Sequence, residues 1–210
     1  MAEIQIQSLV LGMVGTNVFF VMNEETKEMI LIDPADSAGR IEQKVSEMGG
    51  KPVAILLTHG HFDHILAVPE VREFYGIPVW AEESEEAVLE DPRFNLSASW
   101  GQNLSIKADN LCKEGDVLEL AGMSIRVLHT PGHTQGSCCY YLPDNGVLFS
   151  GDTLFYCSCG RTDFPTSSSM EMTESLHRLM RELPDETNVL PGHENFTRID
   201  FEKRYNPFAP

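Results

Sequence analysis

The chain has 210 residues, of which 42% are hydrophobic, and it carries a net charge of −17 from 15 Lys and Arg against 32 Asp and Glu. This length and composition suit one globular domain over 1–210. The acidic balance argues against a nucleic-acid partner, which would need a face rich in Lys and Arg. No apolar run approaches the roughly 18 residues of a membrane span, so no membrane partner is expected.

The first 20 residues contain no Lys or Arg, and so they lack the basic start of a secretory signal. The five cysteines are odd in number and their spacing suggests no disulfide framework. Together these observations predict a reducing, cytoplasmic location. Cys157 and Cys159 form a Cys-x-Cys pair that could bind metal or react, but we interpret them as thiols in a loop near the functional site.

The first half of the chain predicts strands followed by alternating helices and strands. Short or alternating apolar runs between turn residues predict strands over 4–9, 18–21, 29–32, 53–57 and 77–80. Helical spacing of apolar residues predicts helices over 41–48, 65–75 and 82–89. Residues 93–113 show no clear pattern, and they either form a substrate loop or cover the core.

The second half of the chain predicts more strands and one long helix. The strands are predicted over 117–120, 124–128, 137–142, 147–149 and 189–190. Ser168 and Glu171 have the spacing of a capping box for a helix that runs to about Glu182. The order of elements predicts an α+β or α/β sandwich in one domain.

Four polar clusters each follow a predicted apolar strand. They contain, in chain order, His59 with His61, Asp63 and His64, then His133, Asp152 and His193. A glycine stands beside each cluster, where it allows a tight turn. Because strand ends of a layered sheet can bring distant loops to one rim, we expect these clusters to meet.

The residue types in these clusters are those that bind divalent metals. Histidine nitrogen binds zinc, iron or manganese. His59 and His61 are two residues apart, so an extended backbone can point both the same way. Asp152 adds the negative charge that lets two cations lie roughly 3.5–4 Å apart. The sequence therefore predicts two divalent metal ions, zinc in the first instance, with iron or manganese as alternatives. His129 and His177 fit no cluster and are interpreted as ordinary surface or strand-end residues.

The pattern H-x-H-x-D-H followed by GHT, GD and GH resembles the metallo-β-lactamase superfamily over nearly the whole chain. The resemblance implies an α/β fold, a four-layer αββα sandwich of two mixed β-sheets flanked by helices, with the metal site along one rim. It implies one ion on His59, His61 and His133. It implies a second ion on Asp63, His64 and His193, with Asp152 bridging. Asp63 and Asp152 would then be the catalytic carboxylates, and Asp63 would also orient an attacking hydroxide.

Within that superfamily, segments 151–155 and 191–194 are similar to those of glyoxalase II, the hydroxyacylglutathione hydrolases, and segment 160–165 is similar to that of their single-domain bacterial members. The resemblance implies a small-molecule thioester substrate, such as an S-(2-hydroxyacyl)glutathione, cleaved by a hydroxide between the two metals. Two substrate-binding positions depart from the glyoxalase II pattern: Arg161 stands where those enzymes have Lys, and Asn195 where they have Tyr. Arg161 either binds a substrate carboxylate or forms a salt bridge with Asp163.

Other functions remain open at the level of sequence. A persulfide dioxygenase would use one iron on His59, His133 and Asp152. A lactone or phosphodiester hydrolase and a non-catalytic metal-binding domain are further alternatives. Lactamases that cleave antibiotics generally lack an aspartate at the position of Asp152, which argues against that activity. The oligomeric state is not indicated by the sequence.

Overall fold

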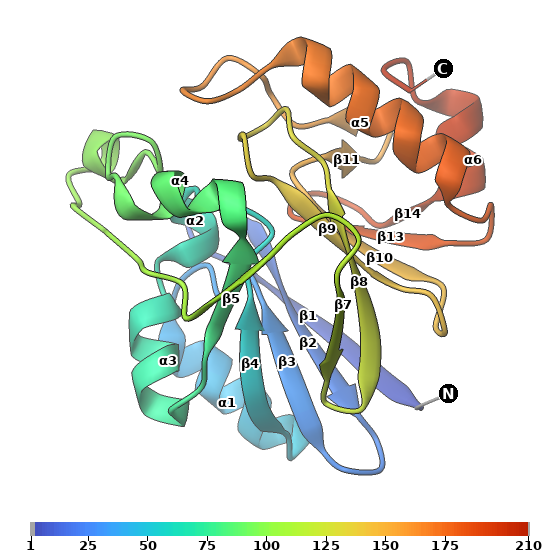
Figure 1. Ribbon diagram of the computed structural model, residues 1–210. Coiled ribbons are helices and arrows are strands. Elements are labelled where there is room, and N and C mark those ends of the chain that lie inside the picture. The colour runs from blue at the N-terminus through green and yellow to red at the C-terminus, as the bar shows by residue number, and fades with distance from the viewer. Residues whose placement is uncertain (1–2, 210) are drawn as a thin grey trace.

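The computed structural model describes residues 3–209 as two six-stranded β-sheets that face each other, with helices on both outer faces (Figure 1). This arrangement confirms the four-layer αββα sandwich that the family resemblance implies. Three groups of buried apolar residues fill the spaces between the layers. Within residues 3–209, no helix is both long enough and apolar enough to cross a membrane.

The first sheet begins with an antiparallel meander and continues with parallel strands. Its order is β1 (Ile4–Leu11), β2 (Thr16–Asn23), β3 (Glu28–Ile32), β4 (Lys51–Leu56), β5 (Val79–Glu82) and β6 (Asn110–Cys112). Side chains of β2 alternate between the helix-facing core and the core between the sheets: Phe20 belongs to the first, and Phe19 and Val21 to the second. Because both faces are covered, the middle of β2, residues 18–22, is a continuous apolar run with no polar face.

The second sheet is also mixed and is also covered on both faces. Its order is β14 (Thr197–Arg198), β13 (Asn188–Pro191), β10 (Val147–Gly151), β9 (Cys138–Leu142), β8 (Met123–His129) and β7 (Val117–Leu120). Only β13 and β10 pair in parallel within it. In β9, Tyr140 faces the core between the sheets while Tyr141 faces the outer helices. A small hairpin of β11 (Leu154–Phe155) and β12 (Ser158–Cys159) follows β10.

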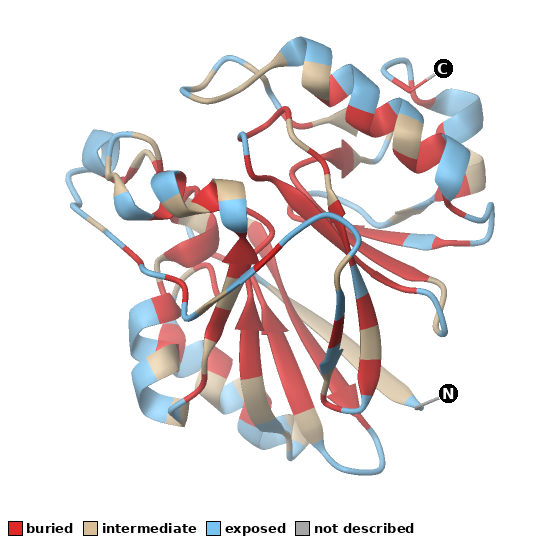
Figure 2. Ribbon diagram, in the orientation of Figure 1, coloured by how far each residue is buried: buried red, intermediate tan, exposed pale blue. Residues whose placement is uncertain are grey.

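The helices bury one side against their sheet and expose the other (Figure 2). The first sheet is covered by α1 (Ala38–Met48) and α3 (Val68–Tyr75), the second by α5 (Ser169–Glu182) and α6 (Ile199–Tyr205). The short elements α2 (Phe62–Ile65), η1 (Glu83–Glu85), α4 (Glu86–Glu90) and η2 (Ser97–Trp100) lie in the connections of the first half of the chain.

Two predicted segments differ from the structure. The helix predicted over 65–75 is interrupted between α2 and α3, because Pro69 lacks an N–H and its ring conflicts with the carbonyl of Ile65 four residues earlier. Residues 93–113, for which the sequence predicts no element, contain η2 and β6. They both cover the core and contribute to a pocket, which are the two purposes suggested from the sequence. Ile106 is buried in the core, whereas Trp100 lines a pocket.

Candidate metal centre

All seven predicted ligands lie together at the rim of the sandwich, although they come from two different sheets. His59, His61, Asp63 and His64 follow β4 of the first sheet and lead into α2. The ligands from the second sheet follow the ends of three strands: β8 precedes His133, β10 precedes Asp152 and β13 precedes His193. Their donor atoms form three overlapping groups in which each atom lies within 4.8 Å of the others.

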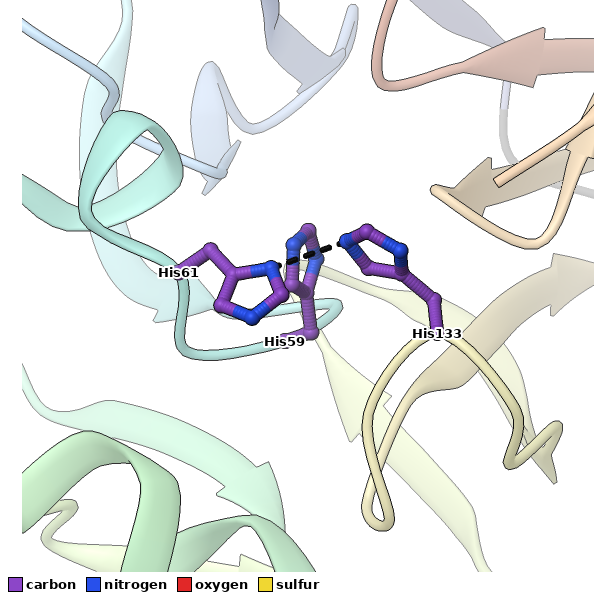
Figure 3. Close-up of side chains that lie close together, drawn as sticks. All are labelled: His59, His61 and His133. Carbon is purple, nitrogen blue, oxygen red and sulfur yellow. Dashed lines mark hydrogen bonds between the residues drawn. The ribbon is translucent and has the colours of Figure 1, made fainter. Parts of the chain in front are cut away.

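The first group consists of His59, His61 and His133, whose rings converge edge to face (Figure 3). His61 Nδ1 lies 2.8 Å from His133 Nε2, and the ring centroids of His59 and His133 are 4.8 Å apart. His59 and His61 approach from one loop and His133 from the facing loop, as Figure 3 shows. Imidazole nitrogens from the two loops therefore lie close together.

The second group consists of Asp63, His64 and His193. His193 Nε2 lies 3.2 Å from both His64 Nε2 and Asp63 Oδ2. Asp152 lies between the two groups, since its Oδ2 is 3.5 Å from both His133 Nε2 and His193 Nε2, and its Oδ1 is 3.4 Å from His64 Nε2. One carboxylate therefore reaches both groups, which is the position that the resemblance implied for a bridging ligand.

Several of these polar atoms are buried without a hydrogen-bond partner. His59 Nε2, His61 Nε2 and Asp152 Oδ1 have none, although their residues are at most 8% exposed. Buried polar groups without partners are costly in a folded protein, unless an ion or water satisfies them. Unpartnered imidazole and carboxylate atoms that face one another fit a divalent cation, so the His and Asp groups suit metal binding.

The charge states of the first ligand group and of Asp152 also suit a cation, whereas, although burial opposes protonation, the nearby carboxylates raise the pKa of His64 and of His193. Burial and the nearby His133 lower the pKa of His61 to about 3, and burial lowers the pKa of His59 and of His133 as well. These imidazoles are therefore neutral near pH 7, which is the form that binds metal. Although burial opposes ionisation, His64 and His193 hold the pKa of Asp152 well below its usual range, so its carboxylate is charged.

Outer partners fix the orientation of the ligand rings. His64 Nδ1 lies 2.9 Å from Asp33 Oδ2, and Asp33 in turn accepts hydrogen bonds from the backbone N–H and the hydroxyl of Thr58. His133 Nδ1 lies 2.8 Å from the carbonyl oxygen of Arg161. Because these contacts occupy Nδ1 of His64 and of His133, it is Nε2 of both rings that faces the other ligands. Sequence reasoning misses Asp33, because an Asp-Pro pair directly after an apolar run is typical of the end of a strand.

Glu85 is a second residue that sequence reasoning missed. Its carboxylate accepts hydrogen bonds from Gly60 N at 2.6 Å, Thr134 Oγ1 at 2.8 Å and Gly136 N at 2.9 Å. The loop that holds His59 and His61 is thereby joined to the loop that follows His133. Gly136 is required at this close approach, because a Cβ there would lie 2.2 Å from the backbone nitrogen of Glu85. No local pattern in the acidic stretch around Glu85 distinguishes it from its neighbours.

The two predicted substrate-binding residues lie in different surroundings. Arg161 lines a pocket of about 670 Å³ that opens over the centre, and its guanidinium forms two hydrogen bonds with Asp163. Asn195 is exposed and is not among the residues that line this pocket. Glu194 lines the pocket instead, because its left-handed backbone, with φ of 65°, turns the chain at this point. Cys159 also lines the pocket, and burial raises the pKa of its thiol.

A four-layer αββα sandwich with a His- and Asp-rich centre at its rim defines a class of metal-binding proteins. Residues 11–193 match the model of the metallo-beta-lactamase superfamily, and the chain belongs to that superfamily. The sequence is 37% identical over 199 residues to "Probable metallo-hydrolase YqgX" of Bacillus subtilis, covering 94% of this chain and 93% of the relative. It is 31% identical over 188 residues to the hydroxyacylglutathione hydrolase GloC of Haemophilus influenzae, covering 88% and 89% respectively.

Two solved structures are similar over almost their full length. The BLEG-1 B3 metallo-beta-lactamase superposes with a TM-score of 0.92 at 38% identity, covering 98% of this chain and 99% of that one. TTHA1623, solved in a di-iron-bound form, superposes with a TM-score of 0.85 at 35% identity, covering 96% and 99%. Both similarities include the two-sheet architecture that brings the metal-binding groups together.

Proposed function

We propose that this chain is a metal-dependent hydrolase that cleaves a small-molecule thioester at a two-metal centre. The observation that carries the proposal is the position of Asp152, whose carboxylate reaches histidines of both ligand groups at 3.4–3.5 Å. A second complete group, Asp63 with His64 and His193, favours two ions over one. This group also argues against the mononuclear iron site of a persulfide dioxygenase, which would leave it without a role.

Each ligand residue has a defined task in this proposal. His59, His61 and His133 would hold one ion, and Asp63, His64 and His193 the other, with Asp152 between them. Two bound cations, zinc by proposal, would make water acidic enough to ionise near neutral pH and would polarise the scissile carbonyl. Asp63 Oδ2 accepts a hydrogen bond from Thr16 Oγ1 at 3.2 Å, which helps to orient this carboxylate. A thiolate is a good leaving group, so the site needs no strong general acid.

The relatives support the reaction class and the metal count. GloC is described as a hydroxyacylglutathione hydrolase, which cleaves a thioester, and YqgX as a metallo-hydrolase. TTHA1623 was solved with two irons, so iron is an alternative to zinc in this proposal. S-(2-hydroxyacyl)glutathione is accordingly one candidate substrate.

Metal analysis combined with a thioester hydrolysis assay tests the proposal. We expect two metal ions per chain, and we expect His61→Ala to lose metal and at least about 100-fold in kcat. His177→Ala is the matched control, because His177 is exposed on α5 and belongs neither to a ligand group nor to the lining of the pocket. Full metal content and activity in His61→Ala would contradict the proposal. One iron per chain with oxygen uptake on a persulfide would favour the dioxygenase instead.

Hydrolysis of a β-lactam is a second candidate function. The similarity to the BLEG-1 B3 metallo-beta-lactamase favours it, whereas the aspartate at position 152 argues against it. A chromogenic cephalosporin assayed beside the thioester, with the same protein and metal content, separates the two. We expect kcat/KM to be higher for the thioester, and the opposite order would assign the site to lactams.

A further inference from the structure

Both loops that carry the first ligand group (Figure 3) are bound to one buried carboxylate, that of Glu85 in η1. Its Oε1 accepts a hydrogen bond from Gly60 N at 2.6 Å. Its Oε2 accepts from Thr134 Oγ1 at 2.8 Å and from Gly136 N at 2.9 Å. Each carboxylate oxygen therefore binds a different loop, and one side chain spans the gap between them.

The donors to this carboxylate lie next to every histidine of the first ligand group. Gly60 stands between His59 and His61, and Thr134 directly follows His133. The backbone on either side of a ligand determines where its ring can lie, so hydrogen bonds at these positions act on all three rings at once.

The ring of His61 has no hydrogen bond that would orient it from outside the ligand groups. In the part of the chain that the structure describes, the one hydrogen-bonding contact of its Nδ1 is with His133 Nε2, and its Nε2 has no partner. The rings of His64 and His133 differ, since each has an outer partner at Nδ1. The position of His61 therefore depends on the backbone of its loop, which Glu85 binds at the preceding residue.

Close packing leaves little freedom between these loops and the segment that holds Glu85. A Cβ on Gly136 would lie 2.2 Å from the backbone nitrogen of Glu85, and a Cβ on Gly60 would lie 3.1 Å from the side chain of Leu89 in α4. Because protein interiors are densely packed, a change at this segment is transmitted to both loops.

We propose that Glu85 is a positioning residue for the first metal ion: by holding the two loops at a fixed separation, it sets how tightly the three histidines bind that ion. Glu85 belongs to neither ligand group and does not line the pocket, so it acts through the loops. This inference rests on the proposed function in one respect, since it needs an ion in the first ligand group. The second ligand group has Asp33 as its own outer partner and should be little affected.

The variant Glu85→Gln tests the role of the two accepting oxygens. It keeps the size of the side chain but replaces one oxygen by an amide NH2, which only donates. Whichever way the amide turns, the backbone N–H of Gly60 or of Gly136 loses its acceptor. We expect the affinity of the first ligand group for zinc to fall about tenfold or more, as for other outer partners of metal ligands. Glu83→Gln is the matched control, because Glu83 is an exposed carboxylate in the same η1.

Two backgrounds with one ligand group each show whether the effect is confined to the first group. His193→Ala keeps the first group complete, and His61→Ala keeps the second. Competition with a chromogenic chelator measures zinc affinity in both. We expect Glu85→Gln to lower it about tenfold in the His193→Ala background and less than about twofold in the His61→Ala background. Equal losses in both would show a general structural role and overturn the proposal, as would no loss in either.

A second variant applies if Glu85→Gln does not fold. Thr134→Val keeps the shape of the side chain and removes the hydroxyl that donates to Glu85 Oε2. The loss of one hydrogen bond should lower zinc affinity about threefold in the His193→Ala background and leave it unchanged in the His61→Ala background. A folded Thr134→Val protein with undiminished affinity in the His193→Ala background would contradict the proposal.

Hydrogen exchange tests whether Glu85 acts through the loops. In metal-free protein we expect Glu85→Gln to speed exchange of the backbone amide of Gly60 or Gly136 about tenfold, as followed by NMR. Glu83→Gln should leave both amides unchanged. Equal exchange rates in wild type and Glu85→Gln would show that the carboxylate does not hold the loops.

The zinc measurements separate failure of this inference from failure of the proposed function, because they require no hydrolysis. If wild type binds zinc but cleaves no thioester, the proposed function fails, and the affinities in the two backgrounds still decide the role of Glu85. If thioesters are cleaved and Glu85→Gln leaves zinc affinity unchanged, this inference is wrong and the proposed function stands. If the first group of the wild type binds no zinc or iron, both are wrong.

Discussion

Two buried carboxylates hold the loops of the metal centre in place. Glu85 accepts three hydrogen bonds, from Gly60, Thr134 and Gly136, and so joins loops that belong to different sheets. Asp33 acts within the first half of the centre, where it accepts hydrogen bonds from Thr58 and lies 2.9 Å from His64 Nδ1. Both act through other residues, and both positions are set by contacts between segments distant in the chain.

Glu85 should make stability depend on pH. Burial raises its pKa from 4.5 to about 7, although its hydrogen bonds oppose this shift. Between these values the unfolded chain releases a proton that the folded chain keeps, so stability falls as pH rises through this window. Relative to Glu85→Gln, which cannot titrate, we expect wild type to lose on the order of 3 kcal/mol between pH 4.5 and 7. Urea unfolding of both proteins at each pH measures this, and a constant difference between them would disprove the shift.

Removing the charge of Asp33 should weaken metal binding at His64. Asp33→Asn takes away the carboxylate that lies 2.9 Å from His64 Nδ1, while keeping the size of the side chain. We expect metal affinity to fall about 10- to 100-fold, as for other outer partners of metal ligands. Competition with a chromogenic chelator measures the affinity. Asp36→Asn, three residues away, serves as the control and should match wild type.

At the level of elements, a local sequence pattern is sufficient to predict a strand or helix where the pattern is long or strongly apolar. The buried strands β2, β3, β4 and β9 and the helix α5 all lie where periodicity and turn residues predict them. The short strands β6, β11, β12 and β14 and the helix α6 were not predicted. Segments of two to seven residues carry too little periodicity, and neighbouring strands or packed helices stabilise them instead.

The N-terminus of α5 forms one half of the predicted capping box, because the backbone N–H of Ser168 donates to the carbonyl oxygen of Gly132. The side chain of Ser168 accepts a hydrogen bond from Glu171 N at 3.3 Å. We expect Ser168→Ala to lower the free energy of unfolding by about 1 kcal/mol, because one N–H of the first helical turn loses its partner. Urea titration gives this value. Ser169→Ala, at the next position and inside the helix, should change stability by less, and equal losses would rule out the cap.

Across the whole molecule, the metal centre joins the two sheets. His59, His61, Asp63 and His64 come from the first sheet, whereas His133, Asp152 and His193 come from the second. The same rim holds the pocket, which takes residues from both halves of the chain. A cation held by these ligands would connect the two halves of the sandwich across the rim.

Metal removal should therefore destabilise the entire fold. A ligand that binds only the folded state stabilises it by about 2.7 kcal/mol when its free concentration is 100 times Kd. We expect chelation to lower Tm, and restored zinc to recover it, with the shift growing as metal concentration rises. Differential scanning calorimetry measures the shift. The variant His61→Ala should show a smaller response, and the same Tm with and without metal in wild type would contradict a structural link between the sheets.

The sequence by itself determined the candidate ligands, the buried strands that precede them and the Ser168 cap of α5, and the family resemblance of its motifs implied the αββα architecture. These features depend on residue type and on spacing within a few residues. Only the tertiary structure decided that Asp152 reaches both ligand groups, that Arg161 is paired with Asp163, that Asn195 lies outside the pocket and that Glu85 joins two loops. For the contacts between the sheets the reason is physical: Glu85 and Gly136 are 51 residues apart, so their contact depends on how the two sheets are placed against each other, and no local pattern records that placement.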